Sequence, residues 1–254
     1  VKAYNSSNAP WMCNSCIYYI CEDSKQNLWF ATKSGVSMRA ADGTPVRFDS
    51  LKVGDVAVRD MVVMQLVEGH DSEMWLASNT HGVIRIQGSG NSLSGYTFSG
   101  YSVSNGKLNS DYANCIYKDV EGRIWVGTGG SGLSLYDAVE DVFLPAHKLW
   151  NLPGDAVTNI QSDKKGNLWL GTNAGLLRLT VPRDLQNVTY RLYTTSDGLQ
   201  DNIFNRGASF VASDGEMFFG GHRGYNSFYP DKQDEQVFSS PVVITDIKVF
   251  NQSW

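Results

Sequence analysis

Short runs of alternating apolar and polar residues, separated by turn residues, fill most of this chain. In NLWLGT (167–172), extended backbone would place Trp169 on the face opposite Leu168 and Leu170. The preceding DKKG (163–166) suits a tight turn, and Gly175 suits a hairpin into LLRLT (176–180). Strand-compatible runs lie on both sides, at 158–163 and 188–195. The pattern therefore predicts a unit of four antiparallel strands.

The same unit occurs five times, and an aromatic residue marks the second strand of each copy. These aromatic anchors are 44 to 50 residues apart, a period typical of repeat architectures. A pair of small residues follows each anchor, and a glycine comes six or seven residues after it. The anchors are Trp29, Trp75, Trp125, Trp169 and Phe218, and the glycines are Gly35, Gly82, Gly132, Gly175 and Gly224.

A single four-stranded sheet cannot bury two apolar faces, but stacked copies of that sheet can. A buried Trp removes roughly 200 Å² from water, which is worth about 5 kcal/mol. The repeated indole is therefore expected to lie as a wedge between neighbouring sheets. The period and strand count predict an all-β fold, a β-propeller of four-stranded antiparallel blades with five repeats visible. A β-helix needs a shorter period, and helical solenoids need 3.6-residue patterning that this chain lacks.

The repeat motif itself resembles that of a known family. DVEGRIWVGT (119–128) and DKKGNLWLGT (163–172) resemble the two-component-regulator propeller repeat. That repeat forms the periplasmic sensor region of hybrid two-component histidine kinases, chiefly in Bacteroidetes-type bacteria. The match is looser in the first two copies, where Gln26 replaces the turn glycine, and Gly69 and Ser72 replace the turn aspartate and glycine.

The C-terminal part of the chain extends the resemblance. The stretches 193–210 and 214–230 resemble the last blade of these sensors, and 239–254 resembles the opening of the small Ig-like β-sandwich that follows it. Because the family's propellers generally have seven blades, the resemblance implies a truncated propeller, and a closed five-bladed ring is the alternative. The expected boundaries are blades over 1–230 (repeats near 16–57, 58–108, 109–153, 154–201 and 202–230), a linker over 231–240 and a truncated sandwich over 241–254.

Composition narrows the possible partners and the compartment. Apolar residues make up 42% of the chain and charged residues 19%, as in a globular protein. The net charge is −5 and no Lys/Arg cluster occurs, so no nucleic acid is expected to bind this chain. No apolar run is long enough for a membrane helix, and no signal peptide opens the chain. The resemblance implies a periplasmic location, with the membrane reached only through downstream segments.

The cysteines and common enzyme motifs suggest no cofactor. Cys13 and Cys16 form a lone C-x-x-C, which leaves a disulfide open but makes zinc improbable; Cys21 and Cys115 fall in apolar runs. The four histidines form no metal-binding pair, and GTGGSG (127–132) joins two strands rather than a strand and a helix. We therefore expect no catalytic residue, no metal and no cofactor in this chain.

A ligand site is instead expected on the loops at one face of the propeller. In propellers, the turn after the second strand and the loop that enters the next blade share a face near the channel. Polar and aromatic residues there suit the hydroxyls and rings of carbohydrates. His222 and Arg223 could meet an anionic sugar, and Trp11 and Tyr112 could stack on sugar rings. The full set of candidates is His222, Arg223, His81, Asn79, Asn173, Lys33, Trp11 and Tyr112.

The resemblance implies a sensor that binds oligosaccharides and signals, as a homodimer, to a cytoplasmic kinase that controls polysaccharide-utilisation genes. One alternative is a propeller enzyme of the streptogramin-lyase type, for which His81 and His222 are the only plausible metal ligands. A second alternative is an interaction scaffold, which would expose a large apolar patch.

Overall fold

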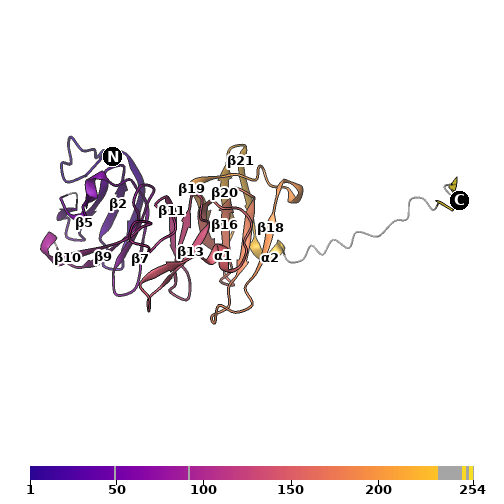
Figure 1. The fold of residues 1–254 in the computed structure, drawn as a ribbon. Helices are drawn as coiled ribbons and strands as arrows, with labels where there is room; N and C mark the ends of the chain where they lie inside the picture. Colours follow the sequence, from indigo (N-terminus) through magenta and orange to yellow (C-terminus); the bar gives the residue numbers. More distant parts are fainter. Residues whose placement is uncertain (49, 91, 234–247, 250–251, 254) are drawn as a thin grey trace.

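Five antiparallel sheets follow one another along the chain in the computed structural model, which describes every residue except 49, 91, 234–247, 250, 251 and 254 (Figure 1). The first four sheets have four strands each, and the fifth has three. They comprise β1 (Ile17–Glu22), β2 (Leu28–Thr32), β3 (Gly35–Arg39) and β4 (Pro45–Arg47); β7 (Val63–Glu68), β8 (Met74–Ser78), β9 (Gly82–Gly88) and β10 (Tyr96–Tyr101); β11 (Ala113–Lys118), β12 (Ile124–Thr128), β13 (Leu133–Asp137) and β14 (Val142–Leu144); β15 (Val157–Ser162), β16 (Leu168–Thr172), β17 (Leu176–Thr180) and β18 (Thr189–Tyr193); and β19 (Phe204–Val211), β20 (Met217–Gly221) and β21 (Gly224–Phe228).

The sheets are the blades of a β-propeller. Their first strands, β1, β7, β11, β15 and β19, lie next to one another in chain order, and strands of the first and last blades line the same central cavity. The predicted all-β propeller of antiparallel blades is thus confirmed. Four strands pair in each of the first four blades, and three strands pair in the fifth among the described residues. A total of seven blades stays a prediction.

The tryptophan anchors lie between neighbouring blades. Trp125 of the third blade packs in one cluster with Leu168 and Leu170 of the fourth, and the other anchors point in the same way toward the following blade. The indoles are at most 2% exposed: Trp29, Trp75, Trp125 and Trp169. Phe218 is only half-buried, because no blade covers its side of the fifth sheet in the described part of the chain.

In the first, third and fourth blades, a buried aspartate before the second strand organises the turn and also holds the indole. Asp163 Oδ1 accepts the backbone N–H groups of Lys165 and Asn167, and its Oδ2 accepts the Trp169 indole N–H at 3.0 Å. The same indole bond, at 2.8 Å, joins Asp23 to Trp29 and Asp119 to Trp125. A single carboxylate thus fixes both the turn and the position of the indole between the blades.

In the second blade, a glutamate takes the place of the aspartate as the acceptor of the indole N–H. Gly69 replaces the aspartate, and the Glu73 carboxylate accepts the Trp75 indole N–H at 2.6 Å. A Cβ at position 69 would lie 2.6 Å from that indole nitrogen and 2.8 Å from the Glu73 carboxylate. Gly69 therefore leaves the space that Glu73 occupies.

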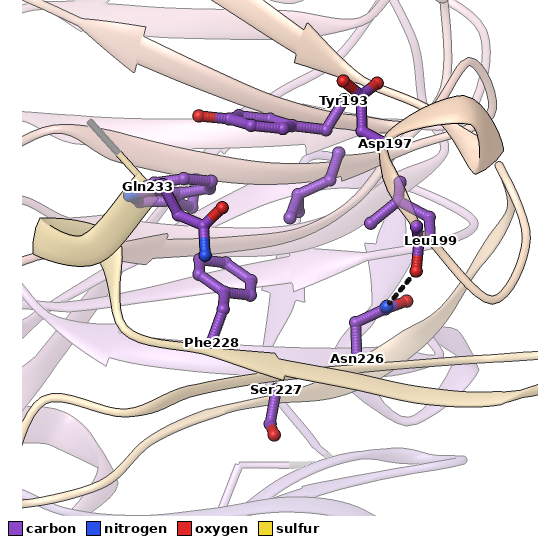
Figure 2. Close-up of a pocket in the computed structure, with 10 residues that line it drawn as sticks. Tyr193, Asp197, Leu199, Asn226, Ser227, Phe228 and Gln233 are labelled. Carbon is purple, nitrogen blue, oxygen red and sulfur yellow. Dashed lines mark hydrogen bonds between the residues drawn. The ribbon is translucent and has the colours of Figure 1, made fainter. Parts of the chain in front are cut away.

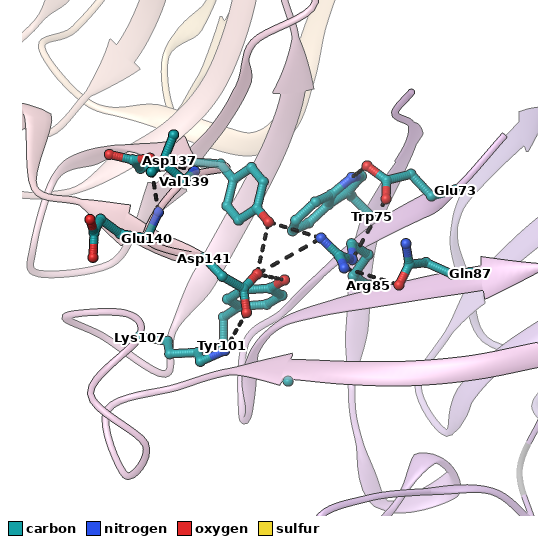
Figure 3. A network of polar contacts seen from close by, with 12 residues as sticks. Glu73, Trp75, Arg85, Gln87, Tyr101, Lys107, Asp137, Val139, Glu140 and Asp141 are labelled. Atoms are coloured by element: carbon teal, nitrogen blue, oxygen red, sulfur yellow. Dashed lines mark hydrogen bonds and ion pairs between the residues drawn. The ribbon is translucent and has the colours of Figure 1, made fainter. Parts of the chain in front are cut away.

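A polar network ties the second blade to the third (Figure 3). Asp141, in the turn between β13 and β14, accepts the hydroxyls of Tyr101 at 2.7 Å and Tyr136 at 2.8 Å. Lys107 pairs with the same carboxylate, and Arg85 lies 3.8 Å from it. Burial alone would raise the pKa of Asp141, but hydrogen bonds from Lys107 and the two tyrosines lower it to about 2.

Other elements depart from the repeated unit. A hairpin of β5 (Lys52–Val53) and β6 (Val56–Ala57) links the first two blades, and the short helices are α1 (Ala146–Leu149) and α2 (Pro230–Gln233). The helix α2 occupies the start of the predicted linker. The rest of that linker and the predicted sandwich strand lie outside the described residues, apart from the short pair β22 (Lys248–Val249) and β23 (Gln252–Ser253). In the described part of the chain, no helix is long and apolar enough to cross a membrane.

Candidate ligand-binding face

Two sets of loops meet at one face of the propeller, which we term the loop face. It comprises the turns after the second strands (33–34, 79–81, 129–132, 173–174 and 222–223) and the segments that enter the first strands (9–16, 58–62, 102–112, 145–156 and 194–203). A backbone hydrogen bond joins the two sets in each of the first four blades: Lys33 N to Cys16 O, Asn79 N to Val62 O, Gly129 N to Tyr112 O, and Asn173 N to Ala156 O. The loops predicted to share a face are therefore hydrogen-bonded to one another.

Glycine is required where these loops approach closely. A Cβ at Gly82 (φ 71°) would lie 2.2 Å from the carbonyl oxygen of Tyr101, and one at Gly132 (φ 69°) would lie 2.3 Å from the His147 ring. Burial of that ring lowers the His147 pKa, which favours neutral imidazole. His147 thus serves packing beneath the loops.

Three predicted site residues lie in the turns after the second strands, and the side chain of one of them, Asn173, ties two loops together. The amide of Asn173 accepts the Asp155 backbone N–H at 3.1 Å and donates to the Asp155 carboxylate at 2.8 Å. Lys33 has an exposed side chain in the first turn. Asn79 Oδ1 is buried without a hydrogen-bond partner among the described residues. Asn79 shares its turn with His81, whereas Lys33 and Asn173 lie on other blades.

His222 and Arg223 form the exposed two-residue turn of the fifth blade. The backbone N–H of Arg223 donates to Gln200 Oε1 at 2.8 Å, and its guanidinium lies 3.6 Å from Asp201. Neither residue lines the cavities described below. The contact of these two residues with an anionic sugar therefore stays a prediction.

The two predicted stacking residues differ in environment. Trp11 packs its edge against Phe30 of the first blade, with ring centroids 5.5 Å apart. That contact leaves the indole half-buried. Tyr112 is 62% exposed on the loop face and keeps its ring available for stacking.

A polar cavity of about 390 Å³ opens on the loop face beside His81, and we term it the His81 cavity. The His81 Nδ1 lies 2.8 Å from the Thr80 hydroxyl, which fixes the ring at the cavity wall. The polar lining otherwise consists of two carboxylates, two hydroxyls 2.9 Å apart and one amide: Asp55, Asp111, Ser102, Ser104 and Asn105. Carboxylates and hydroxyls at this density suit hydrogen bonding to a polyhydroxylated ligand.

The β5–β6 hairpin forms one wall of the His81 cavity and supplies Asp55. It packs on β10 at Gly100, where a Cβ would lie 2.5 Å from Val53 Cγ1. Asp55 was not among the predicted residues, although the Gly-Asp pair at 54–55 is a turn signal. Asp111 and Asn105 lie in the segment that enters the third blade and were not singled out from the sequence.

A second cavity, of about 340 Å³, is the central channel. Amides from one inner strand bond to the free edge of the next: Gln65 Oε1 accepts the N–H of Ile116, and Asn159 Nδ2 donates to Asn205 O at 2.8 Å. Burial raises the pKa of Tyr19 in this cavity. The polar and aromatic lining carries no charged group: Tyr19, Gln65, Asn159, Gln161, Ser209 and Phe210.

No set of three or more His, Cys, Asp or Glu side chains is placed to hold a metal ion within the described ranges. His81 and His222, the residues considered for a lyase-type metal site, belong to the second and fifth blades. Cys16 carries a free, exposed thiol, and Cys13 donates its thiol to the Val36 carbonyl at 3.2 Å. Burial raises the thiol pKa of Cys21 to about 11 and that of Cys115 to about 12, which keeps both protonated at neutral pH.

Three segments of the chain match the two-component regulator propeller family: 12–34, 107–130 and 151–174. Each match spans the loop into a blade and that blade's first two strands, in the first, third and fourth blades. Histidine kinase P4 of Formosa agariphila is 31% identical over 99 residues, which cover 39% of this chain and 7% of that protein.

Solved structures with the same fold include extracellular domains of putative two component systems and a lyase. The extracellular domain of the putative hybrid two component system BT3049 from B. thetaiotaomicron has a TM-score of 0.62 at 18% identity, covering 100% of this chain and 39% of that chain. The corresponding domain of BT4673 has a TM-score of 0.62 at 16% identity, covering 84% and 27%. Virginiamycin B lyase from Staphylococcus aureus has a TM-score of 0.57 at 15% identity, covering 84% and 69%.

Proposed function

We propose that this chain, whose first, third and fourth blades match the two-component regulator propeller family, is the ligand-sensing part of a periplasmic hybrid two-component sensor. Its ligand is an oligosaccharide, and the site is the His81 cavity on the loop face. In the longer protein, binding shifts a homodimer between two arrangements and so controls the kinase and polysaccharide-utilisation genes.

The observation that carries the proposal is the lining of the His81 cavity. Two carboxylates and two serine hydroxyls there can accept hydrogen bonds from hydroxyl groups, and the carboxylates of Asp55 and Asp111 are the strongest acceptors among them. Those two carboxylates also disfavour an anionic sugar. A neutral oligosaccharide therefore fits this cavity better than a uronate, whereas a uronate suits His222 and Arg223.

The proposal is tested by thermal shift and calorimetry of the full chain against neutral and uronate-containing oligosaccharides. A specific neutral ligand raises the melting temperature, because it binds the native state only. His81→Ala and Asp55→Asn each weaken its binding at least about tenfold. Both side chains lie at the cavity wall rather than in the core.

His222→Ala serves as the matched control, since it also removes an imidazole from a loop-face turn. It is expected to leave affinity for the neutral ligand unchanged. Loss of binding in His222→Ala alone, or a response only to uronates, would contradict the site proposed here.

A further inference from the structure

The inner strand of the fifth blade carries a wider bulge than the inner strands of the other blades. In β1, β7, β11 and β15, the register shifts between two residues that are two positions apart and that pair with neighbouring residues of the second strand. In β19, five positions separate Phe204 from Ser209, whereas their partners Gly221 and Phe219 are two positions apart. The bulge of β19 thus holds three extra residues, against one in each of the other inner strands, and a bulge redirects the side chains that it carries.

The bulge brings Arg206 to the loop-face end of the inner strands, which we term the channel mouth. Asn159, which is 2% exposed, holds the bulge by donating from Nδ2 to the Asn205 carbonyl at 2.8 Å. Gly207 follows with a φ of 68°, a left-handed conformation that glycine adopts at little cost. The Arg206 Nη1 donates to Asn114 Oδ1 at 3.5 Å, so this side chain reaches from the fifth blade to the inner strand of the third.

The charge of Arg206 is not compensated. Its guanidinium is exposed, and it makes no ion pair with any carboxylate in the described part of the chain. Its long hydrogen bond to Asn114 leaves most of its five N–H donors available. The Arg223 guanidinium, in contrast, lies 3.6 Å from the Asp201 carboxylate. An anion at the loop face is therefore bound better by Arg206 than by Arg223.

The first blade places a phenol near the same guanidinium. Tyr18 lies at the bulge of β1. Its hydrogen bond with Cys16 and its burial raise the pKa of the Tyr18 hydroxyl, whereas the positive charge of Arg206 acts to lower it. The raised pKa keeps the hydroxyl protonated at neutral pH, so Tyr18 is a second hydrogen-bond donor at the channel mouth.

The central channel continues from this mouth as a neutral cavity of about 340 Å³, and Gly207 lines it next to Arg206. Two of its rings are open to a ligand, since Phe210 is 63% exposed and Tyr19 39%. Gln161 donates to Ser209 Oγ at 3.0 Å, and its carbonyl oxygen accepts no hydrogen bond within the described ranges. Rings, a free amide oxygen and hydroxyls suit a hydroxylated ring, and the volume suits a monosaccharide.

A second cavity that borders the fifth blade does not suit an anion. It has a volume of about 150 Å³ and lies between the fourth and fifth blades, where Tyr193 and Phe228 face each other (Figure 2). Asp197 lies in its wall, and the Asp197 carboxylate accepts the Thr194 N–H at 2.8 Å. The described lining includes no Lys or Arg to offset that negative charge. Of these two cavities, the channel is therefore the one that suits a carboxylate.

We propose that the channel mouth binds the carboxylate of a single hexuronate, a sugar acid, whose ring lies in the channel cavity. Arg206 and the Tyr18 hydroxyl donate to the carboxylate. The ring packs on Phe210, and its hydroxyls bond to Gln161 and Ser209. This site shares no residue with the His81 cavity, so the chain has one site for a neutral oligosaccharide and another for a single anionic sugar.

Calorimetry of the full chain with D-glucuronate, D-glucose and acetate tests the channel site. Saturable binding of D-glucuronate is expected. D-Glucose lacks the carboxylate and acetate lacks the ring, so each binds at least about tenfold more weakly.

Variants locate the bound sugar acid. Arg206→Gln weakens D-glucuronate binding at least about tenfold and leaves the melting temperature of the free chain unchanged, because the guanidinium is exposed. Its matched control is Arg59→Gln, which removes another exposed arginine from the loop face and leaves binding unchanged. Phe210→Ala weakens binding of D-glucuronate several-fold and has little effect on acetate. Arg206→Gln binds the neutral oligosaccharide of the His81 cavity normally, so the two sites are tested separately.

Three results would overturn the proposal. The first is no saturable binding of D-glucuronate to the folded chain. The second is equal affinity for D-glucose or for acetate, because the carboxylate or the ring would then contribute nothing. The third is loss of binding in Arg223→Gln while Arg206→Gln binds normally, which would assign the sugar acid to the turn of the fifth blade.

Discussion

At the scale of single residues, the turn aspartate that precedes the second strand of the first, third and fourth blades links local turn chemistry to blade packing. Asp163 is 7% exposed and accepts four hydrogen bonds, one of them from an indole buried between blades. Its loss would leave several buried N–H groups without acceptors, and each such group costs about 1–3 kcal/mol.

Replacing Asp163 by Ala is therefore expected to lower the free energy of unfolding by about 2–4 kcal/mol. Urea denaturation followed by Trp fluorescence measures the change. Asp184→Ala is the control, because that exposed carboxylate accepts a single backbone N–H and its loss should cost under about 0.5 kcal/mol. Equal costs for the two variants would contradict the role of the turn carboxylate.

The sequence allowed part of this residue-level picture to be predicted. The Asp-Gly turns and the spacing of the tryptophans predicted the tight turns and the wedges. The indole bond was not predicted, although the constant spacing of six residues in Asp23–Trp29, Asp119–Trp125 and Asp163–Trp169 was a usable signal. The role of Glu73 as the acceptor of the Trp75 indole N–H could not be predicted from the sequence, because it depends on the space beside Gly69.

At the scale of elements, the site depends on a part that breaks the repeat. The β5–β6 hairpin has two strands of two residues each, too short for any periodic pattern, and it fell inside the predicted first repeat. Loop positions could be assigned to one face, but which of them would enclose a cavity could not.

Gly100 tests whether the hairpin shapes the site. Gly100→Val pushes against Val53 Cγ1 and is expected to displace the hairpin, weakening oligosaccharide binding at least about tenfold with little loss of blade stability. Calorimetry measures the affinity. Thr97→Val on the same strand is the control and should bind the oligosaccharide normally. If Gly100→Val binds it with the affinity of the natural chain, the hairpin does not shape the site.

Asp141 makes the interface of the second and third blades sensitive to acid. Because its pKa is lowered to about 2 in the folded chain from an ordinary 3.8, its contribution to stability is present above about pH 4 and is lost as pH falls toward 2. Asp141→Asn should therefore be less stable than the natural chain at pH 6. The difference should shrink between pH 4 and pH 2 in urea denaturation, and a constant difference would contradict the network.

At the scale of the whole molecule, the central channel and the His81 cavity differ in how they are built. Amides in the channel bond from one inner strand to the next and hold the blades around their axis. The His81 cavity lies instead between a hairpin and the loops of the second blade, where a ligand can enter without parting the blades. A ligand there contacts three segments that belong to the first two blades and their connections.

Hydrogen–deuterium exchange of the full chain, with and without a neutral oligosaccharide that shifts its melting temperature, tests the account most directly. Ligand should slow exchange in 52–57, 79–81 and 102–111, the segments that line the His81 cavity, and leave 194–203 and 222–223 unchanged. Protection confined to the loops of the fifth blade would contradict the account.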